Sequence, residues 1–293
     1  MPLASLPMYD LAEARPATDA LWQALRQAFQ REGLTEAPEL LTRGAPVLSQ
    51  WASPDLFFSQ CCGYDLVFGF SSALELLAVP RYAQDTGCSA YDYRSCIVVR
   101  DDSPAVGLED LRGAICAVNG FNSYSGTGAL RALVAPLSRN GRFFGGVKVS
   151  GSHVRSADTV RSGDADVAAI DCVTHALLVR HRPQALAGLR ILRRTDPVPA
   201  PPFIASQYLA PDDIARMRTA LISELSRRPR PAYCDDLFID GAETVILPAY
   251  SRLLAEDEKS LRLRYYEMYP TGAALLRPEA QILDDRPQLM ASG

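Results

Sequence analysis

The chain has 293 residues, of which 48% are hydrophobic and 22% are charged, which is an ordinary composition for a globular protein of one or two domains. Its formal net charge of −4 gives no electrostatic case for nucleic-acid binding, because nucleic-acid-binding proteins usually carry a basic face. Apolar runs of roughly 18 residues or more do not occur, so the sequence predicts no membrane insertion.

The predicted elements of the first third alternate between strands and helices. Residues 6–8 indicate a first strand, and Pro16 and Thr18 open a helix whose apolar residues recur at helical spacing until Gly33 ends it. Residues 55–60, 74–79 and 93–100 are strand-like, and residues 108–113 form a short helix closed by glycine.

The middle third repeats a unit of strand, polar loop and helix. Residues 114–118 predict a buried strand, Asn119, Gly120 and Asn122 mark a loop, and a helical pattern begins at Ser125. The next predicted elements are, in order, a strand at 146–150, a helix at 152–161, a strand at 166–170, a helix at 173–179 and a strand at 189–192.

The last third begins with a proline-rich connector at 195–202, the best candidate for a domain boundary. A strand-like segment at 203–209 and a helix at 211–225 follow, then short mixed elements that end in a helix near 255, and the tail beyond Pro270 has no strong period. The alternation predicts an α/β fold with parallel-rich sheets and helices on both faces.

Two extended crossings bracket a self-contained block of this alternation. We therefore predict a discontinuous first lobe, residues 1–97 plus 197–293, and an inserted second lobe, residues 98–196, with hinge strands near 93–100 and 195–203. Such a layout puts a ligand cleft between the lobes, at the carboxyl ends of the strands.

Polar side chains follow three of the predicted second-lobe strands. The first group is Ser123-Tyr124-Ser125-Gly126, the second contains His153 and Ser156, and the third is Asp171. The helix start at Ser125 offers free amides, the positive end of a helix dipole and two hydroxyls, which suits a phosphate, sulfate or carboxylate group.

Each of these residues also has a purely structural interpretation, which the sequence leaves open. A serine and a glycine at a helix start are common capping residues, His153 could be solvated there, and Asp171 could cap the helix that follows it. If Asp171 faces a ligand, it could accept a hydrogen bond from a P–OH group or from an amino group, whereas it would repel fully ionised sulfate.

The chain resembles the phosphate/phosphite/phosphonate substrate-binding proteins of ABC importers, the PhnD-like branch of the type II periplasmic binding-protein fold. The residues that carry the resemblance lie between about 90 and 172. They are Tyr93-Arg-Ser-Cys-Ile-Val-Val-Arg, Leu108-Glu-Asp-Leu-Arg-Gly, Ala117-Val-Asn, Ser123-Tyr-Ser-Gly126, Ser150-Gly-Ser-His153 with Ser156, and Gly163-Asp-Ala-Asp-Val-Ala-Ala-Ile-Asp171.

The resemblance implies a monomeric binding protein without cofactor or reaction, whose two lobes close on a small anion and which works with an ABC permease. It implies that Ser123, Tyr124 and Ser125 hold the oxyanion together with His153 and Asp171, and that Tyr9 and Tyr64, with Gln60 beside them, serve the first lobe. It also implies a periplasmic location, although residues 1–10 lack the pattern of a secretory signal, so a cytoplasmic sensor or accessory protein of the same fold is the alternative.

Other classes find less support in the residues. Gly69-Phe-Ser71-Ser-Ala73 is a near match to a nucleophile elbow, with Asp171 and His175 in the order of a serine hydrolase but only one turn apart. Neither a nucleotide-binding glycine motif nor a zinc-protease motif is complete, so no metal is predicted.

The cysteines do not form a metal-binding pattern either, since their spacing lacks C-x-x-C pairs. Most lie inside apolar runs, where a free thiol behaves as a small hydrophobic group. A disulfide between Cys62 and Cys88 is the alternative that the sequence leaves undecided if the protein is exported. The seven are Cys61, Cys62, Cys88, Cys96, Cys116, Cys172 and Cys234.

Overall fold

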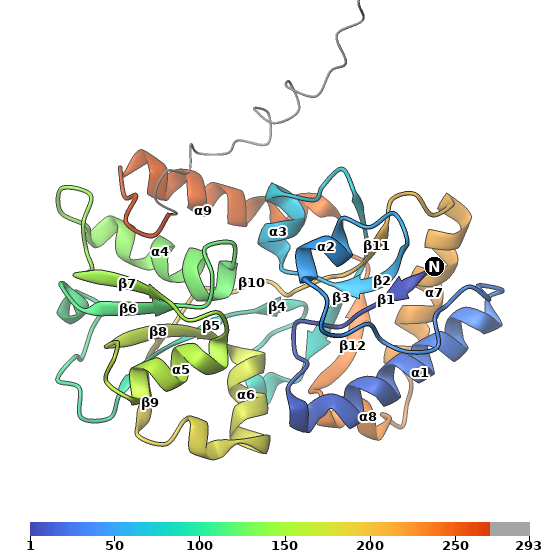
Figure 1. The fold of residues 1–293 in the computed structure, drawn as a ribbon, viewed down its shortest axis with the longest axis horizontal. Helices are drawn as coiled ribbons and strands as arrows, with labels where there is room; N and C mark the ends of the chain where they lie inside the picture. The colour runs from blue at the N-terminus through green and yellow to red at the C-terminus, as the bar shows by residue number, and fades with distance from the viewer. Residues whose placement is uncertain (270–293) are drawn as a thin grey trace, which may run out of the picture.

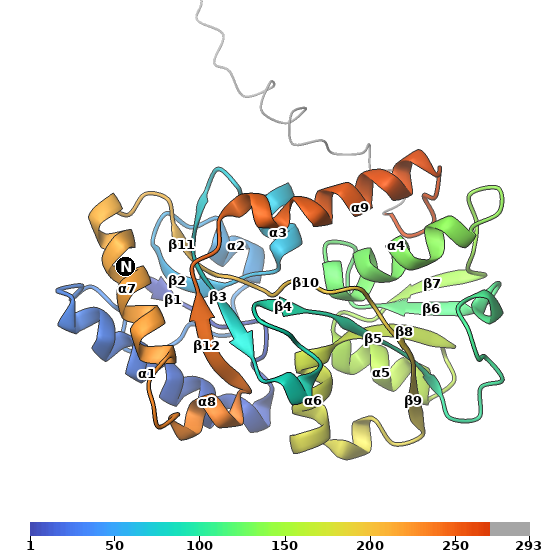
Figure 2. The same cartoon turned by 180° about the vertical axis from the view of Figure 1, so that it is seen from behind.

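The computed structural model describes residues 1–269 and contains two five-stranded sheets joined by a two-stranded ladder (Figures 1 and 2). We call the elements around the first sheet the first lobe. Its strands, in spatial order, are β1 (Leu3–Ala4), β2 (Leu56–Gln60), β11 (Phe203–Ser206), β3 (Leu74–Tyr82) and β12 (Ile239–Glu243). The tail beyond Pro270, for which the sequence shows no period, lies outside the described residues.

The second lobe surrounds the other sheet. In spatial order its strands are β7 (Gly146–Val149), β6 (Ile115–Val118), β8 (Val167–Asp171), β5 (Ser95–Arg100) and β9 (Leu189–Arg194). β6 runs parallel to β7 and β8, whereas β5 runs antiparallel to β8 and β9. The carboxyl ends of β6, β7 and β8 therefore lie at one edge, as the sequence predicted for its three polar groups.

The helices cover both sheets. In the first lobe they are α1 (Arg15–Arg31), α2 (Val47–Trp51), α3 (Gly63–Phe68), α7 (Pro211–Leu225) and α8 (Ala232–Asp236); in the second they are α4 (Ala129–Val134), α5 (His153–Arg161) and α6 (Cys172–His181). α9 (Ser251–Arg262) runs along the upper side of Figure 1 and contacts both α3 and α4. Short helical turns occupy residues 12–14, 84–86, 109–111, 124–128, 135–137, 183–185 and 247–250.

Local signals predicted most elements well. α7 spans the predicted 211–225, and α1 buries Leu21, Trp22 and Leu25 against the first sheet before Gly33, at φ +84°, ends it. The ring of Trp22 stacks on Phe58, with centroids 5.6 Å apart, so the amphipathic period predicted from the sequence is the one that the core uses.

Three predictions about elements differ from the structure. The first strand is β1, Leu3–Ala4, because residues 3 and 4 pair with β2, whereas residues 6–8 pair with no strand. The predicted strand at 93–100 is two elements, β4 (Asp92–Tyr93) and β5, interrupted at Arg94. The short helices α2 and α3 were not predicted, because five or six residues give too little periodicity to detect.

The chain crosses between the sheets at β4 and β10 (Val198–Pro199), which pair antiparallel with each other. The predicted lobe boundaries at 98 and 196 remain a proposal, in which this ladder is the hinge. One part of the predicted division does not match: Tyr265 and Met268, assigned to the first lobe, lie fully buried in the core of the second lobe. After α9 the chain has thus returned to the second lobe.

The lobes pack directly against each other. A single cluster of buried apolar side chains extends from the first sheet to Ile170 and to Val173 and Leu177 of α6. Beside this cluster, Arg182, which directly follows α6, pairs with Glu13 at 2.8 Å, and the Arg180 guanidinium lies 3.7 Å from the centre of the Phe238 ring. These contacts describe a closed arrangement of the lobes. Among residues 1–269, no helix combines the length and the apolar character that crossing a membrane requires.

Candidate functional site

The loop after β6 turns into a helical segment that begins with five residues of π-helix, Tyr124–Gly128. Ser123 caps it: its hydroxyl accepts from the Gly126 amide at 3.2 Å, and its carbonyl accepts from the Thr127 and Gly128 amides. The Ser125 amide donates to no partner within residues 1–269. Of the predicted oxyanion donors, the Ser125 amide is therefore free, whereas the next three amides serve the cap.

Gly126 is required by a close approach. A Cβ at this position would overlap Oδ1 of Asn119 and would lie 3.2 Å from Cε1 of His153. Asn119 Oδ1 is buried and has no hydrogen-bond partner among the described residues. The sequence analysis named Asn119 as a loop residue and as part of the Ala117-Val-Asn motif of the resemblance, but it did not predict Asn119 as a site residue.

His153 joins the loop to β8. Its Nε2 lies 2.9 Å from Ser125 Oγ and 3.4 Å from Asp171 Oδ2, and its Nδ1 lies 3.1 Å from the carbonyl oxygen of Ala169. The predicted convergence of Ser125, His153 and Asp171 at one sheet edge is what the structure contains. The Nδ1 atom must carry hydrogen to donate to the carbonyl, so in the neutral ring Nε2 accepts from the Ser125 hydroxyl.

The protonation of His153 is set mainly by its burial. Burial lowers the pKa of the imidazole below its ordinary value of 6.5, and the nearby Asp171 carboxylate opposes that shift. The ring is therefore neutral near pH 7 until another negative charge joins the cluster.

Asp171 caps α6, the structural role that the sequence left open. Oδ1 accepts from the amides of Val173 and Thr174 at 3.0 and 2.9 Å, and Oδ2 accepts from the Thr174 hydroxyl. Oδ2 also faces His153, so the carboxylate retains acceptor capacity on the side of the cluster.

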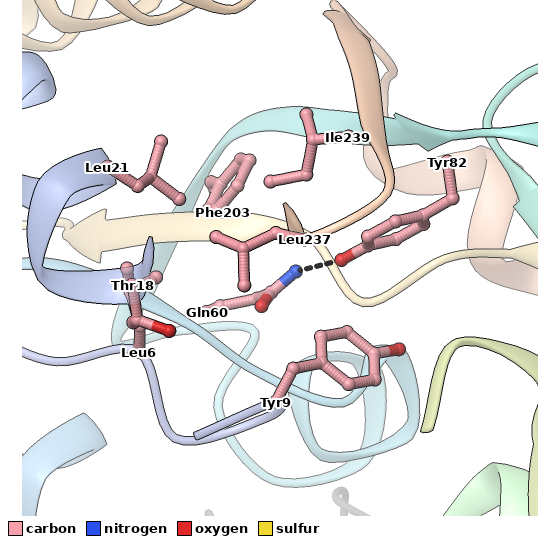
Figure 3. A pocket seen from close by; sticks show the side chains of 9 residues that line it. All are labelled: Leu6, Tyr9, Thr18, Leu21, Gln60, Tyr82, Phe203, Leu237 and Ile239. Atoms are coloured by element: carbon pink, nitrogen blue, oxygen red, sulfur yellow. Dashed lines mark hydrogen bonds between the residues drawn. The ribbon is translucent and has the colours of Figure 1, made fainter. Parts of the chain in front are cut away.

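Two predicted first-lobe residues line a small cavity, shown in Figure 3. Gln60 donates to Tyr82 Oη at 3.1 Å and to the Pro201 carbonyl at 2.9 Å. The Tyr9 hydroxyl points away from Gln60 and is buried without a partner among the described residues. The cavity has about 20 Å³, which holds one water molecule and is too small for a phosphonate.

Tyr9 nevertheless lies near the second-lobe cluster. Burial raises the pKa of the Tyr9 phenol, and the Asp171 carboxylate is the next largest cause. Burial also raises the pKa values of Tyr82 and Tyr93, with Asp171 again contributing. Phenols of the first lobe and of the crossing strand therefore lie close enough to the Asp171 carboxylate for its charge to raise their pKa values. No local pattern in the sequence predicted a role for Tyr82.

Three other predicted site residues lie elsewhere. The Tyr64 hydroxyl donates to Asp257 of α9 at 2.7 Å, and the Tyr124 hydroxyl binds Glu256 of α9, so only the backbone of Tyr124 belongs to the loop. Ser156 is fully buried, with its hydroxyl 2.7 Å from that of Ser150. We therefore place the Tyr64, Tyr124 and Ser156 side chains outside the cluster of Ser125, His153 and Asp171, since each has a structural partner of its own.

The geometry does not support the predicted hydrolase alternative. Ser71 lies on an exposed turn that leads from α3 into β3, whereas a nucleophile elbow leads from a strand into a helix. The Ser125–His153–Asp171 cluster is no relay either, because serine and carboxylate face the same ring nitrogen. Among residues 1–269 no group of three or more His, Cys, Asp or Glu side chains could hold a metal ion.

Asp65 connects α3 to Asn122 in the loop after β6, and its burial has a measurable consequence. Its Oδ1 accepts from Asn122 Nδ2 at 3.1 Å, and burial raises its pKa from 3.8 to about 6. The folded protein thus holds a proton that the unfolded chain has lost between pH 4 and pH 6, so this residue lowers stability as pH rises through that window.

Replacing Asp65 with Asn keeps an acceptor for Asn122 and removes the buried charge. We expect Asp65→Asn to raise the free energy of unfolding by about 1 to 3 kcal/mol at pH 7.5 and to leave it unchanged near pH 4. Urea unfolding at the two pH values measures this. Asp110→Asn is the control, because two amides lower the pKa of that exposed carboxylate and its loss brings no gain. An equal effect of Asp65→Asn at both pH values would contradict the assignment.

Comparison with known proteins identifies chains with a similar sequence pattern and a similar fold. A family model described as the periplasmic substrate-binding protein of the phosphonate ABC transporter matches residues 62–245, more than half of the chain. A search of curated proteins found no match.

Solved structures are similar over nearly the whole chain. A binding-protein component of an ABC phosphonate transporter from Pseudomonas aeruginosa is 14% identical with a TM-score of 0.72, covering 96% of this chain and 93% of that one. PhnD1 from Prochlorococcus marinus, in complex with methylphosphonate, is 13% identical with a TM-score of 0.65, covering 88% and 97%. The alkanesulfonate-binding protein SsuA from Xanthomonas axonopodis pv. citri, bound to MOPS, is 14% identical with a TM-score of 0.62, covering 90% and 93%. These likenesses confirm the predicted type II periplasmic binding-protein fold.

Proposed function

Because the chain belongs to the periplasmic phosphonate-binding proteins of ABC transporters, we propose that it captures a small phosphonate-type anion between its lobes for import and catalyses no reaction. The ligand contacts would come from the Ser125 amide and hydroxyl and from His153 and Asp171, with Tyr9 as the first-lobe contact. Ser123 and Gly126 would shape the loop, and Gln60 would hold the first-lobe wall.

One observation supports this proposal above the others: the Ser125 hydroxyl lies 2.9 Å from His153 Nε2, next to a free amide at the start of a helical segment. An oxyanion that enters this point replaces the imidazole as the partner of the hydroxyl. The ring then takes up a proton and donates from Nε2, since a negative charge beside it raises its pKa. Hydrogen bonds of this charged kind contribute roughly 1.5 to 3 kcal/mol each.

The site is buried in the closed arrangement, since Ser125 is 7% exposed and Asp171 3%. The ligand must therefore enter when the lobes separate. The partnerless hydroxyl of Tyr9, held in the first lobe near Asp171, is the group that would complete the ligand shell upon closure.

The carboxylate of Asp171 supports phosphonate rather than sulfonate. A phosphonate monoanion carries a P–OH group that can donate to Oδ2, whereas a sulfonate has no proton near neutral pH and meets only the repulsion of the carboxylate. Solved structures with this fold bind phosphonates and sulfonates alike, so the fold does not distinguish the two ligand classes. Asp171 provides a test that does.

We expect the protein to bind methylphosphonate at least tenfold more tightly than methanesulfonate, about 1.4 kcal/mol, and Asp171→Asn to abolish most of that preference. Asparagine is itself a good helix cap, so α6 keeps its start. Isothermal titration calorimetry with the two compounds measures the preference. A preference that is unchanged in Asp171→Asn would remove Asp171 from the ligand shell. Native mass spectrometry of the purified protein would identify a co-purified anion.

A further inference from the structure

Two thiols meet where the lobes pack together. Cys88 Sγ lies 3.2 Å from Cys172 Sγ, although the residues are 84 positions apart. Both side chains are buried, and all seven cysteines are free, so the Cys62–Cys88 pairing considered from the sequence is not formed. The contact of Cys88 is with the second lobe.

The two thiols are held by different lobes. Cys88 follows the turn at 84–86, which is tied to the first lobe: the Ala83 amide donates to the Phe238 carbonyl at 2.7 Å, and the Cys88 amide donates to Thr86 Oγ1 at 3.3 Å. Cys172 is the first residue of α6 and directly follows Asp171, in the second lobe. Residues 88 and 172 thus lie on either side of the β4–β10 crossing, and separation of the lobes would separate the sulfurs.

The pair is chemically asymmetric. The hydrogen-bonded contact between the two thiols lowers the pKa of Cys88 and raises the pKa of Cys172. While the two sulfurs are in contact, Cys88 is therefore the one that more readily becomes a thiolate. A bonded pair of sulfurs is about 2.05 Å apart, so a further approach of about 1 Å between a turn and a helix start would suffice.

We propose that Cys88 and Cys172 form a disulfide that locks the lobes in the closed arrangement, with a small-molecule or protein disulfide as the oxidant. In the open form Cys88 loses its proton and attacks one sulfur of the oxidant, which releases one thiol. After closure the deprotonated Cys172 sulfur attacks Cys88 in the mixed disulfide, the Cys88–Cys172 bond forms, and the second thiol leaves. Two cysteines are oxidised, and one disulfide is reduced to two thiols.

Locking would act on ligand exchange, since the proposed anion site is buried while the lobes are closed. The effect on ligand exchange rests on the proposed function. Formation of the disulfide and closure of the ligand-free protein do not depend on that function. The bond closes a loop of 84 residues across the hinge, so it also restricts the unfolded chain.

The test treats the ligand-free protein with oxidised glutathione. We expect a non-reducing peptide map of the oxidised protein to contain one linked pair, Cys88 with Cys172. In small-angle scattering, the radius of gyration of the oxidised protein should no longer fall when methylphosphonate is added. Reduction with dithiothreitol should restore the response. Cys88→Ser and Cys172→Ala should form no linked pair and respond to ligand before and after treatment, whereas Cys234→Ser, a buried cysteine of α8, should behave as the unmodified protein.

Absence of the linked peptide would overturn the proposal, as would a linked protein that remains as extended as the reduced form. If the oxidised protein is compact but methylphosphonate produces no heat with the reduced protein, the disulfide stands and the ligand assignment fails. The dissociation of bound methylphosphonate should slow at least tenfold upon oxidation, and an unchanged rate would contradict the lock.

Discussion

Replacing both Ser125 and His153 with alanine is expected to weaken methylphosphonate binding by about 100-fold, which corresponds to about 2.7 kcal/mol. The two side chains lie 2.9 Å apart and would each give the oxyanion one hydrogen bond. Each single replacement should cost about tenfold, and because the groups touch, the double effect can differ from the product of the single ones. Isothermal titration calorimetry gives the affinities.

Ser138→Ala is the matched control, since Ser138 lies at the other end of the same helical segment and its hydroxyl donates to the Ala135 carbonyl. Its affinity should equal that of the unmodified protein. Thermal unfolding separates a loss of binding from a loss of folding. If Ser125→Ala and His153→Ala both retain the original affinity while folded, the proposed site is wrong.

Replacing Arg131 with Met is expected to destabilise the protein by about 3 to 5 kcal/mol. Arg131 of α4 pairs with Asp257 of α9, and these side chains are only 2% and 8% exposed. Tyr64 and Tyr269 also donate to Asp257, at 2.7 and 2.9 Å. Loss of the guanidinium leaves a buried carboxylate held by two phenols alone, and removes one of the links between α9 and the second lobe.

Urea unfolding measures this change. Arg161→Met is the matched control, because Arg161 pairs with Asp158 on the exposed face of α5, where such a pair contributes less than about 1 kcal/mol. The double change Arg131→Met with Asp257→Leu should recover most of the loss, since it removes both charges. A cost below 1 kcal/mol for Arg131→Met would show that the buried pair does not stabilise the closed lobes.

Local patterns were enough to predict much of the fold and the centre of the site. The amphipathic period identified α1 and α7, and the rule that parallel strands end at one edge brought together Ser125, His153 and Asp171, whose contacts are 2.9 and 3.4 Å. The prediction of the helices and the prediction of the converging strand ends both use residue patterns that lie within one element or in the element next to it.

The remaining features depend on contacts between distant parts of the chain. Tyr64 was predicted at the ligand, but α3 directs it to Asp257, 193 residues away, and the same helix α9 takes the Tyr124 hydroxyl. The buried guanidinium of Arg131 is held by Tyr64 of α3 and Asp257 of α9, which are both distant from it in the sequence. The partnerless oxygen of Asn119 likewise follows from the close packing of Gly126, which no periodicity records.

A crystal structure of the protein with methylphosphonate tests the central claim most directly. We expect the phosphonate oxygens at about 2.7 to 3.2 Å from the Ser125 amide and hydroxyl and from His153 Nε2, with Tyr9 closing over the ligand. Methylphosphonate bound elsewhere, with the Ser125–His153 contact of 2.9 Å intact, would contradict the claim.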